Sequence, residues 1–389
     1  MSAVDALDLI DEWGPEKIVC VSDARTGMRG VLVIDNTARG IGKGGTRMTP
    51  TVTVTEVARL ARVMTWKWAG VDLFFGGAKA GIRADPESPD KERVLRAFVR
   101  ALANEVPHEY VFGLDLGLTE DDAAIIQDEL GDRGAAVGTP RELGGIPYDA
   151  WGVTGHGVAE AADAALAHRD EALRDARVVL QGFGAVGAAA AARLAELGAA
   201  VVGISTSRGA LHHPEGLDVK ELLAARQQHG DALIEHVTQP NLRRLHAGEE
   251  LRLDADVLVP AATQDVVDAG LAGDVRCRVL VEGANLPTTR DAQRVLANRG
   301  ITVVPDFVAN AGGVVAAAYA MDARRSPFPV EQSRIFEAVS HKMRVNTTVV
   351  LDEAGSTGET SHEAARRLAA ERVRTAMELK RRVPEAVAA

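Results

Sequence analysis

The first third of the chain combines β-rich runs with one long amphipathic segment. Residues 17–34 hold two apolar runs on either side of the turn tripeptide RTG, which predicts a hairpin within a sheet. Residues 54–68 repeat their apolar side chains at helical spacing instead. We therefore expect one long helix, capped by Thr53 or Thr55, that carries Lys67 near its end.

Two glycine-dense segments lie on either side of this predicted helix. Residues 40–48 and 74–90 are rich in glycine and are interpreted as loops. An amphipathic stretch from about residue 91 to residue 105 predicts a second helix, and the β-rich run 109–117 predicts a strand that opens into a loop.

The pattern changes after a stretch rich in glycine and proline at residues 138–153, where we place a domain boundary. A helix is expected next, and short β-rich runs then alternate with helical stretches. This alternation predicts a parallel, doubly wound sheet. From about residue 325 the pattern is helical to the end. The predicted strands are RVVLQ, AVVGIS, DVLVP, RVLVEG and ITVVPD.

The length of 389 residues suits two domains of roughly 100–200 residues each. The fold class expected is α/β. Residues 1–140 are assigned to a substrate-binding, catalytic and oligomerisation domain, and residues 141–325 to a Rossmann dinucleotide-binding domain. Residues 326–389 are expected to form C-terminal helices that pack back on the first domain.

Composition narrows the choice of partners and compartment. The net charge is −11, and the basic residues are scattered among acids, so neither nucleic acid nor a membrane surface is an expected partner. The acidic start lacks the pattern of a signal peptide, which favours a cytoplasmic location. Cys20 and Cys277 lie far apart and outside any cysteine or histidine cluster, so reduced structural thiols and no metal site are expected.

The segment GFGAVG at residues 182–187 carries the strongest local signal. It follows a predicted strand and opens a predicted helix, which is the setting of a dinucleotide-binding turn, whereas a glycine turn without a ligand is the plainer alternative. The amides at the helix start would face the cofactor phosphates. The residues assigned to this cofactor loop are Gly182, Phe183, Gly184, Ala185, Val186 and Gly187.

The choice between NAD and NADP depends on the end of the next strand. A fold that prefers NAD usually has an acid there for the ribose 2′-hydroxyl, and this chain has Thr206, Ser207 and Arg208. These three residues are candidates for binding a 2′-phosphate, which slightly favours NADP. A merely solvated arginine is the alternative, so NAD stays open.

One lysine stands out in the first domain. Lys79 lies in FFGGAKAGI, whose small and apolar residues would desolvate an ammonium group and lower its pKa, and such a lysine can act as a general base or acid. Asp115 lies in the similarly apolar VFGLDLG, where an unpaired carboxylate is costly to bury. From the residues alone, a catalytic pair and a structural ion pair are both open.

The chain resembles the glutamate/leucine/phenylalanine/valine dehydrogenase family over nearly its whole length. The matching segments keep their order along the chain. They are KGGTRM (43–48), MTWK (64–67), GGAKAGI (76–82), the Asp115 loop, GTPRELGGIP (138–147), VTGHGV (153–158), QGFGAVG (181–187), VPAA (259–262), VEGAN (281–285) and PDFVANAGGV (305–314).

The resemblance implies a role for each matching residue. Lys79 assists catalysis, Asp115 transfers protons, and Lys67 binds the substrate α-carboxylate. Thr154 and Asn310 approach the nicotinamide and the substrate, and the VPAA and VEGAN segments contribute to the cofactor site. The implied reaction is reversible oxidative deamination of an L-amino acid to a 2-oxo acid and ammonia with NAD or NADP, in a homo-oligomer and specifically a hexamer. The residues taken from those two segments are Ala261 and Asn285.

The signals for the amino acid conflict. Lys43 stands where glutamate-type members pair a lysine with the side-chain carboxylate, yet Ala317 replaces the serine that helps to hold it. Trp68 and Phe74 also depart from the family pattern, and a tryptophan on a helix belongs to a core more often than to a pocket. Glutamate ranks first, ahead of an aliphatic or aromatic amino acid and of an unusual substrate.

Two other classes of protein compete with this interpretation. A regulatory subunit would bind a dinucleotide and an amino acid without turnover, but Lys67, Lys79 and Asp115 are all retained. A hydroxy-acid oxidoreductase would need a catalytic histidine with a carboxylate partner. His156 is the only histidine near a motif, and its glycine-rich helix start suggests packing.

Overall fold

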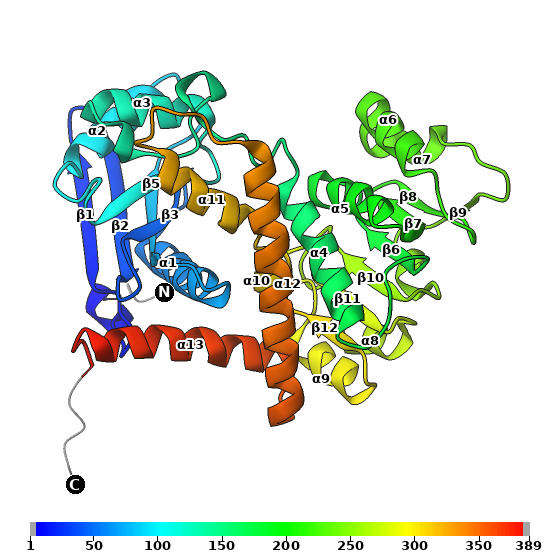
Figure 1. Ribbon diagram of the computed structural model, residues 1–389. Helices are drawn as coiled ribbons and strands as arrows, with labels where there is room; N and C mark the ends of the chain where they lie inside the picture. Colours follow the sequence, from blue (N-terminus) through cyan, green and yellow to red (C-terminus); the bar gives the residue numbers. More distant parts are fainter. Residues whose placement is uncertain (1–4, 384–389) are drawn as a thin grey trace, which may run out of the picture. The chain divides into compact units, whose positions relative to one another are not determined.

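The computed structural model describes residues 5–383, so the first four and last six residues of the predicted domains lie outside the described part. The chain divides into two compact units, and Figure 1 labels their elements. Unit 1 runs from the amino terminus to Pro147 and includes Ala317–Glu331 and the chain from Ala369 onward, while unit 2 holds Tyr148–Ala316 and Gln332–Leu368. The helices predicted for residues 326–389 were expected to pack on the first domain. This prediction is wrong for residues 332–368, which belong to unit 2.

Unit 1 is built on a five-stranded sheet in the order β1-β2-β4-β3-β5. The β1–β2 hairpin is antiparallel, as its turn signal predicted, and β2 is antiparallel to β4. Strands β4, β3 and β5 run parallel. The strands are β1 (Lys17–Asp23), β2 (Met28–Asn36), β3 (Gly42–Thr49), β4 (Gly76–Arg83) and β5 (Tyr110–Leu114).

Helices cover both faces of this sheet because the side chains of β2 alternate between two cores. Leu32 packs in the core shared with the second and third helices, whereas Val33 packs in the core shared with the first. The first helix begins where the Thr53 side chain accepts a hydrogen bond from the Glu56 amide, so Thr53 is the cap. These helices are α1 (Val54–Gly70), α2 (Lys91–Ala101) and α3 (Glu120–Leu130).

Strands β3 and β4 lie within the two glycine-dense segments, so the prediction of loops was wrong for residues 42–48 and 76–83, whereas residues 84–90 do form a loop. Their glycines serve close packing inside the sheet rather than turns. A Cβ atom on Gly44 would lie 1.7 Å from the Ala78 carbonyl oxygen, and one on Gly77 would lie 2.1 Å from the Thr65 hydroxyl of α1. Glycine density therefore marks where strands and a helix approach one another too closely for a side chain.

Unit 2 contains a seven-stranded sheet in the order β12-β11-β10-β6-β7-β8-β9. Strands β12 to β7 are parallel, which confirms the doubly wound fold, and β8 and β9 add an antiparallel edge that the sequence did not indicate. The strands are β6 (Arg177–Gln181), β7 (Ala200–Thr206), β8 (Gly209–His212), β9 (Arg243–Leu245), β10 (Val257–Pro260), β11 (Val279–Val281) and β12 (Thr302–Val304).

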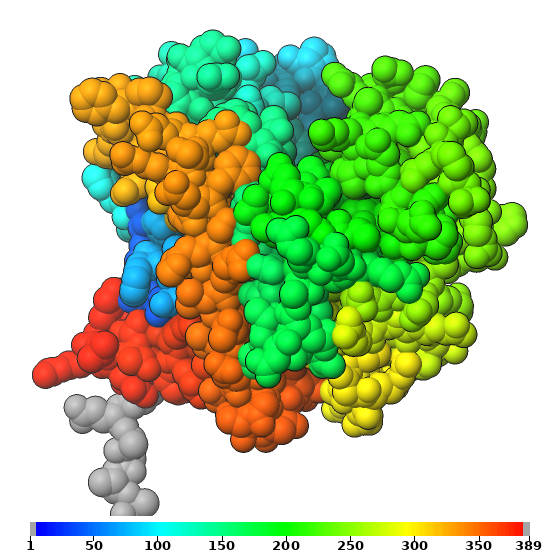
Figure 2. Space-filling model, turned by 45° about the vertical axis from the view of Figure 1, so that its right-hand side comes forward, coloured from blue at the N-terminus to red at the C-terminus, as the bar shows by residue number. Residues whose placement is uncertain are grey.

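Within unit 2, helix α12 runs beside α4, which explains why residues 332–368 belong to this unit (Figures 1 and 2). Helices α11 and α13 contribute residues to both units. The helices of the second half of the chain are α4 (Val153–Ala167), α5 (Ala185–Glu196), α6 (Val219–His229), α7 (Leu233–His236), α8 (Ala269–Asp274), α9 (Arg290–Asn298), α10 (Asp306–Ala309), α11 (Gly312–Ala323), α12 (Gln332–Thr357) and α13 (Ser361–Leu379).

Among the described residues, none of the helices combines the length and apolar character needed to span a membrane.

Candidate active site and cofactor site

Lys79 and Asp115 meet in unit 1. Lys79 lies on β4 and Asp115 directly follows β5, so strand β3 separates them in the sheet. The Lys79 Nζ atom lies 2.7 Å from Asp115 Oδ2, and the lysine side chain is only 9% exposed. Gly45 of β3 leaves room for this contact, because a Cβ atom there would lie 2.8 Å from Asp115 Cβ.

Burial and pairing act in opposite directions on this ion pair. Burial lowers the pKa of Lys79, and the adjacent Asp115 carboxylate only partly restores it. Burial raises the pKa of Asp115, but the Lys79 charge and hydrogen bond and the Arg47 charge outweigh it, so this pKa lies below its usual value. The pair therefore joins an ionised carboxylate to a lysine that gives up its proton more readily than usual.

Arg47 is a positioning residue that the sequence reasoning missed. Its Nε atom donates to Asp115 Oδ2 at 3.1 Å, and its Nη1 atom donates to Glu56 Oε1 at 2.8 Å. Asp115 thus accepts bonds from two cations at one oxygen. Arg47 lies in the motif KGGTRM. Reading this segment as a strand would place Arg47 on the same face as Gly45 two residues earlier, but its glycine content predicts a loop.

Lys43 is buried without an acid. Its side chain lies over Gly113, its residue is 3% exposed, and its Nζ atom donates to the Phe112 carbonyl oxygen at 3.2 Å and to that of Val111 at 3.4 Å. Within residues 5–383 no carboxylate lies at ion-pair distance from this ammonium. Burial, together with the charges of Lys79 and Arg324, lowers the pKa of Lys43 to about 7.

A second cation in unit 1 acts on Lys43. Arg324 follows α11, and its Nη1 atom donates to the Met321 carbonyl oxygen, while its buried Nε atom has no hydrogen-bond partner. Burial lowers the pKa of Arg324. Ala317, which lies earlier on α11 and is half-buried, offers no polar group. Lys43 and Arg324 are thus two basic groups close enough for the arginine charge to lower the pKa of Lys43.

Lys67 and Trp68 are consecutive residues near the end of helix α1, but their surroundings differ. Lys67 lies in the last turn of the helix and is half-buried. Trp68 is 1% exposed, packs against Phe75, and donates from its indole nitrogen to the Lys43 carbonyl oxygen at 3.1 Å. Trp68 is therefore a core residue that fixes the Lys43 backbone, whereas Phe74 is 72% exposed.

The glycine loop of unit 2 lies between the carboxyl ends of β6 and β10, where the strand order reverses. This is the switch point at which open α/β sheets bind their ligands. Gly182 has φ +95° and packs against Ala262, and a Cβ atom on Gly187 would lie 1.9 Å from the Gly182 carbonyl oxygen. Gly184 faces open space, and no side chain caps the start of α5. These residues fit a dinucleotide pyrophosphate.

A buried relay holds this loop in place. The Ser205 hydroxyl, at the end of β7, accepts a hydrogen bond from the Gly182 amide at 3.1 Å and donates to Glu250 Oε1 at 2.8 Å. Glu250 is 1% exposed, and its other oxygen accepts from the Gly248 amide. Arg226 of α6 adds a bond from its Nε atom to the Phe183 carbonyl oxygen at 2.9 Å. None of these supporting residues was predicted.

Thr206 and Ser207 contact the turn between α6 and α7, and Arg208 contacts α7 itself. The Thr206 hydroxyl donates to the Asp231 carbonyl oxygen at 2.9 Å, and the Ser207 hydroxyl donates to Asp231 Oδ2 at 2.6 Å. Arg208 forms a 3.0 Å ion pair with Glu235. The three residues predicted as phosphate ligands thus already have partners, and two of these partners are acids.

The remaining predicted residues of unit 2 gather around two loops. The Asn310 amide donates to the Ala284 carbonyl oxygen at 3.2 Å and to Asn285 Oδ1 at 3.1 Å. Gly313 brings the start of α11 close to Thr154, since a Cβ atom on Gly313 would lie 3.1 Å from the Thr154 hydroxyl. Ala261 directly follows β10 and packs beside Gly283. Residues far apart in sequence, from Thr154 to Asn310, therefore belong to the loops and helix starts of unit 2 that these contacts join.

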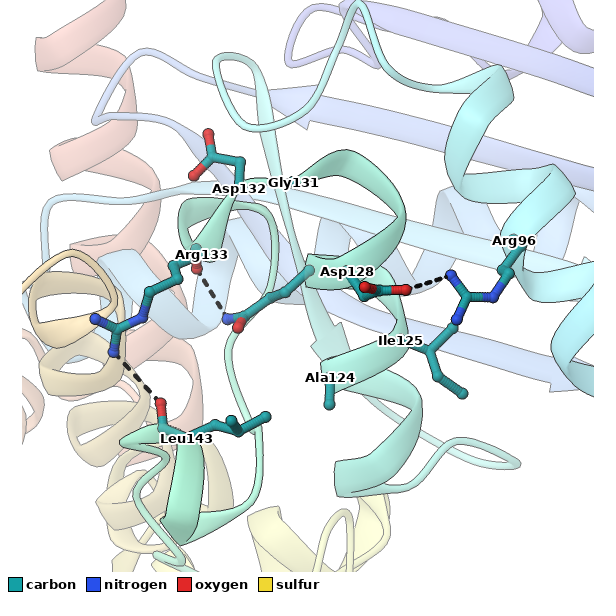
Figure 3. A pocket seen from close by; sticks show the side chains of 9 residues that line it. Arg96, Ala124, Ile125, Asp128, Gly131, Asp132, Arg133 and Leu143 are labelled. Carbon is teal, nitrogen blue, oxygen red and sulfur yellow. Dashed lines mark hydrogen bonds and ion pairs between the residues drawn. The ribbon is translucent and has the colours of Figure 1, made fainter.

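Three other candidate features lie outside these sites. His156 is bonded to Ser340 at 2.8 Å and packs against Phe336, as its expected packing role required. Cys20 is exposed rather than structural, whereas Cys277 is half-buried and burial raises its pKa to about 12. A groove of about 530 Å³ in unit 1 has a lining that includes Arg96 and Asp128 but none of the predicted site residues (Figure 3).

The two sites together define a class of protein. A glycine loop at the switch point of a doubly wound sheet is typical of dinucleotide-binding proteins, and a buried lysine beside an acid adds acid–base chemistry, as in a dehydrogenase. Residues 144–381 match the family model for Glutamate/Leucine/Phenylalanine/Valine dehydrogenase, and residues 15–132 match the dimerisation domain of Glu/Leu/Phe/Val dehydrogenase. The chain belongs to this family of amino-acid dehydrogenases.

Relatives of known type support this assignment. A glutamate dehydrogenase of Thermotoga maritima is 41% identical over 296 residues, which cover 73% of this chain and 70% of the relative. An NADP-specific glutamate dehydrogenase of Saccharolobus shibatae is 35% identical, with coverages of 80% and 76%. An NAD-specific glutamate dehydrogenase of Staphylococcus aureus is 38% identical, with coverages of 72% and 68%.

Solved structures show the same fold. The hetero-hexameric glutamate dehydrogenase of Thermus thermophilus, in a leucine-bound form, is 34% identical with a TM-score of 0.77, covering 94% of this chain and 90% of that one. Glutamate dehydrogenase of Peptoniphilus asaccharolyticus is 26% identical with a TM-score of 0.83, covering 97% and 95%.

Proposed function

We propose that this protein catalyses the reversible oxidative deamination of L-glutamate to 2-oxoglutarate and ammonia, with NAD or NADP as the hydride acceptor. Family membership supports the reaction type, and the named relatives include both NAD-specific and NADP-specific glutamate dehydrogenases. The glycine loop supports the cofactor, because Gly184 leaves open space beside the uncapped start of α5.

The acid–base steps belong to unit 1 in this proposal. Lys67 binds the substrate α-carboxylate, and neutral Lys79 takes a proton from the water that attacks the iminium carbon. Asp115, held by Lys79 and Arg47, transfers protons to and from the departing amino group. When bound, the nicotinamide accepts the hydride from the amino-acid α-carbon. Thr154 and Asn310 of unit 2 would contact the nicotinamide.

One observation carries the choice of glutamate: Lys43 is buried with no carboxylate partner in the described chain. A buried cation without an acid is costly, and an anionic substrate side chain would supply the missing charge. Arg324 adds positive charge near Lys43, which strengthens the preference for an anionic side chain. An aliphatic or aromatic amino acid, the second candidate, is favoured only by Ala317.

The oligomer and the location are part of the proposal as well. We propose a homo-oligomer, specifically a hexamer, because residues 15–132 match a dimerisation domain and the Thermus thermophilus relative is described as hetero-hexameric. Light scattering of the purified protein measures this directly, and a monomer would contradict it. The cytoplasmic location expected from the sequence stays a prediction.

A reductive-amination assay tests the reaction. The full-length protein is mixed with ammonia, NADH or NADPH, and one 2-oxo acid at a time, and nucleotide oxidation is followed by absorbance. We expect turnover of 2-oxoglutarate, and Lys79→Ala should lower kcat by at least about a hundredfold because the acid–base group is lost. Lys91→Ala removes another unit 1 lysine from an ion pair, with Asp122, and should retain activity. If no 2-oxo acid is reduced, the enzyme assignment is wrong.

The substrate is tested separately with Lys43→Leu. This variant should lose kcat/KM for 2-oxoglutarate by at least about a hundredfold, because the side-chain carboxylate loses its cation. Its use of 2-oxoisocaproate should stay the same or improve. An equal loss for both acids would mean that Lys43 acts in folding or catalysis and does not select the side chain.

A further inference from the structure

The carboxyl end of β7 is built around one aspartate that comes from another segment. Asp231 lies in the short turn Gly230–Ala232 that follows α6. Its carbonyl oxygen accepts from the Thr206 hydroxyl at 2.9 Å, and its Oδ2 atom accepts from the Ser207 hydroxyl at 2.6 Å. Two consecutive residues at the end of β7 therefore fix both the backbone and the carboxylate of Asp231.

In a doubly wound sheet, the carboxyl end of the strand after the glycine loop lies beside the ribose of the dinucleotide. The end of the strand after the glycine loop is where an acid of an NAD-binding fold accepts a hydrogen bond from the ribose 2′-hydroxyl. In this chain β7 ends at Thr206 and is followed by Ser207, so the strand end supplies no acid. We propose that Asp231 supplies it from outside the strand and that the protein prefers NAD(H) over NADP(H); this inference rests on the dinucleotide site of the proposed function.

The cations near this position are already engaged. Arg208 is paired with Glu235 at 3.0 Å, so its charge is opposed by a second acid. Arg226 donates from its Nε atom to the Phe183 carbonyl oxygen and is thereby held at the glycine loop. A 2′-phosphate beside Ser207 would face the carboxylates of Asp231 and Glu235, and like charges repel.

The local backbone presents the carboxylate to solvent. Gly230 ends α6 with φ +55° and ψ −133°, a conformation that turns the chain sharply before Asp231. Asp231 and Ser207 are both exposed, so a ribose can reach the carboxylate without displacing any part of the core. The exposure also means that Asp231 can be replaced with little risk to folding.

Direct binding measurements test this preference without turnover. NADH and NADPH are titrated into the full-length protein without substrate, and the dissociation constants come from nucleotide fluorescence. The wild-type protein should bind NADH at least about tenfold more tightly than NADPH. Asp231→Asn should weaken NADH binding, strengthen NADPH binding and bring the ratio close to one. Glu235→Gln, which releases Arg208, should strengthen NADPH binding alone.

A matched control comes from the same sheet, at the amino ends of its parallel strands. Asp254 pairs with Arg177 where β6 begins, and Asp254→Asn should leave both dissociation constants unchanged. Equal or tighter binding of NADPH by the wild-type protein overturns the inference, and so does an unchanged ratio in Asp231→Asn. Binding of neither nucleotide would instead overturn the dinucleotide site of the proposed function, and the inference with it.

Discussion

The ammonium group of Lys79 and the carboxylate of Asp115 lie 2.7 Å apart across the glycine-rich strand β3. This pairing tunes the lysine rather than simply neutralising it. Burial lowers the pKa of Lys79, and Asp115 raises it again by only part of the difference. The net result suits a group that must be neutral to accept a proton and charged to return it.

The first prediction concerns the pH dependence of deamination in Asp115→Asn. Because Asp115 raises the pKa of Lys79, removing its charge lowers that pKa further. More lysine is then neutral at a given pH, so the rising limb of kcat/KM should move to lower pH. The plateau should fall by at least about tenfold, because proton transfer through the carboxylate is lost.

The control for this profile is Asp128→Asn, which removes an exposed carboxylate from an ion pair with Arg96 elsewhere in unit 1. Its limb should coincide with that of the wild-type protein. A shift of the Asp115→Asn limb to higher pH would show that the titrating group is not Lys79.

The second prediction is that Lys43 costs stability. The pKa of Lys43 falls from 10.5 to about 7 on folding, so between these values the unfolded chain binds more protons and stability rises with pH. Lys43→Met removes this contribution. It should raise the free energy of unfolding at neutral pH by about 2 kcal/mol and flatten its rise with pH.

Thermal unfolding measured across this pH range gives both quantities. Lys17→Met, which removes a half-exposed lysine from a pair with Glu109, serves as the comparison and should give no such gain. If Lys43→Met is less stable than the wild-type protein, the ammonium is better satisfied than its two carbonyl contacts indicate.

Local pattern was sufficient for much of the fold. Helical spacing predicted α1, and Thr53, which caps this helix, was one of the two candidate caps. The turn tripeptide predicted the β1–β2 hairpin. The glycine loop at Gly182 was identified by its position between a strand and a helix. These features depend on residues close in sequence, where the chain's own periodicity holds the information.

Other features depend on what packs against them. The segments that contain Gly44 and Gly77 are predicted as loops from their glycine content, but both residues lie in strands, where Ala78 and Thr65 leave no room for a side chain. Strands β8 and β9 are short strands at one side of the sheet, and their burial does not alternate. Asp231 and Glu250 support the cofactor site from segments distant in sequence, and no spacing rule links them to the glycine loop.

The third prediction concerns the relay from Glu250 to the glycine loop. Ser205→Ala removes the acceptor of the Gly182 amide and the donor to Glu250. The bond from the Gly182 amide is the one that holds the loop, and its loss costs about 1 kcal/mol, so the dissociation constant for the preferred nucleotide should rise about fivefold. Ser340→Ala, which breaks a bond to His156 elsewhere in unit 2, should leave it unchanged. Equal binding by both variants would mean that the loop holds its shape without the relay.

The last prediction concerns the space that glycine leaves for the acid–base pair. In Gly45→Ala the new Cβ atom would lie 2.8 Å from Asp115 Cβ and 2.6 Å from the Leu114 carbonyl oxygen, so Asp115 must move. A shift of about 1 Å in such a group costs about a hundredfold in rate, and we expect kcat to fall by that factor while nucleotide binding in unit 2 is retained.

Gly355→Ala provides the comparison, since its Cβ atom on α12 would meet nothing within 4 Å. Alanine is the better helix former, so this variant should gain about 0.5–1 kcal/mol of stability and keep wild-type activity. Steady-state kinetics, nucleotide titration and thermal unfolding on both variants distinguish a displaced carboxylate from a misfolded unit 1. Full activity in Gly45→Ala would show that Asp115 functions without its position beside Lys79.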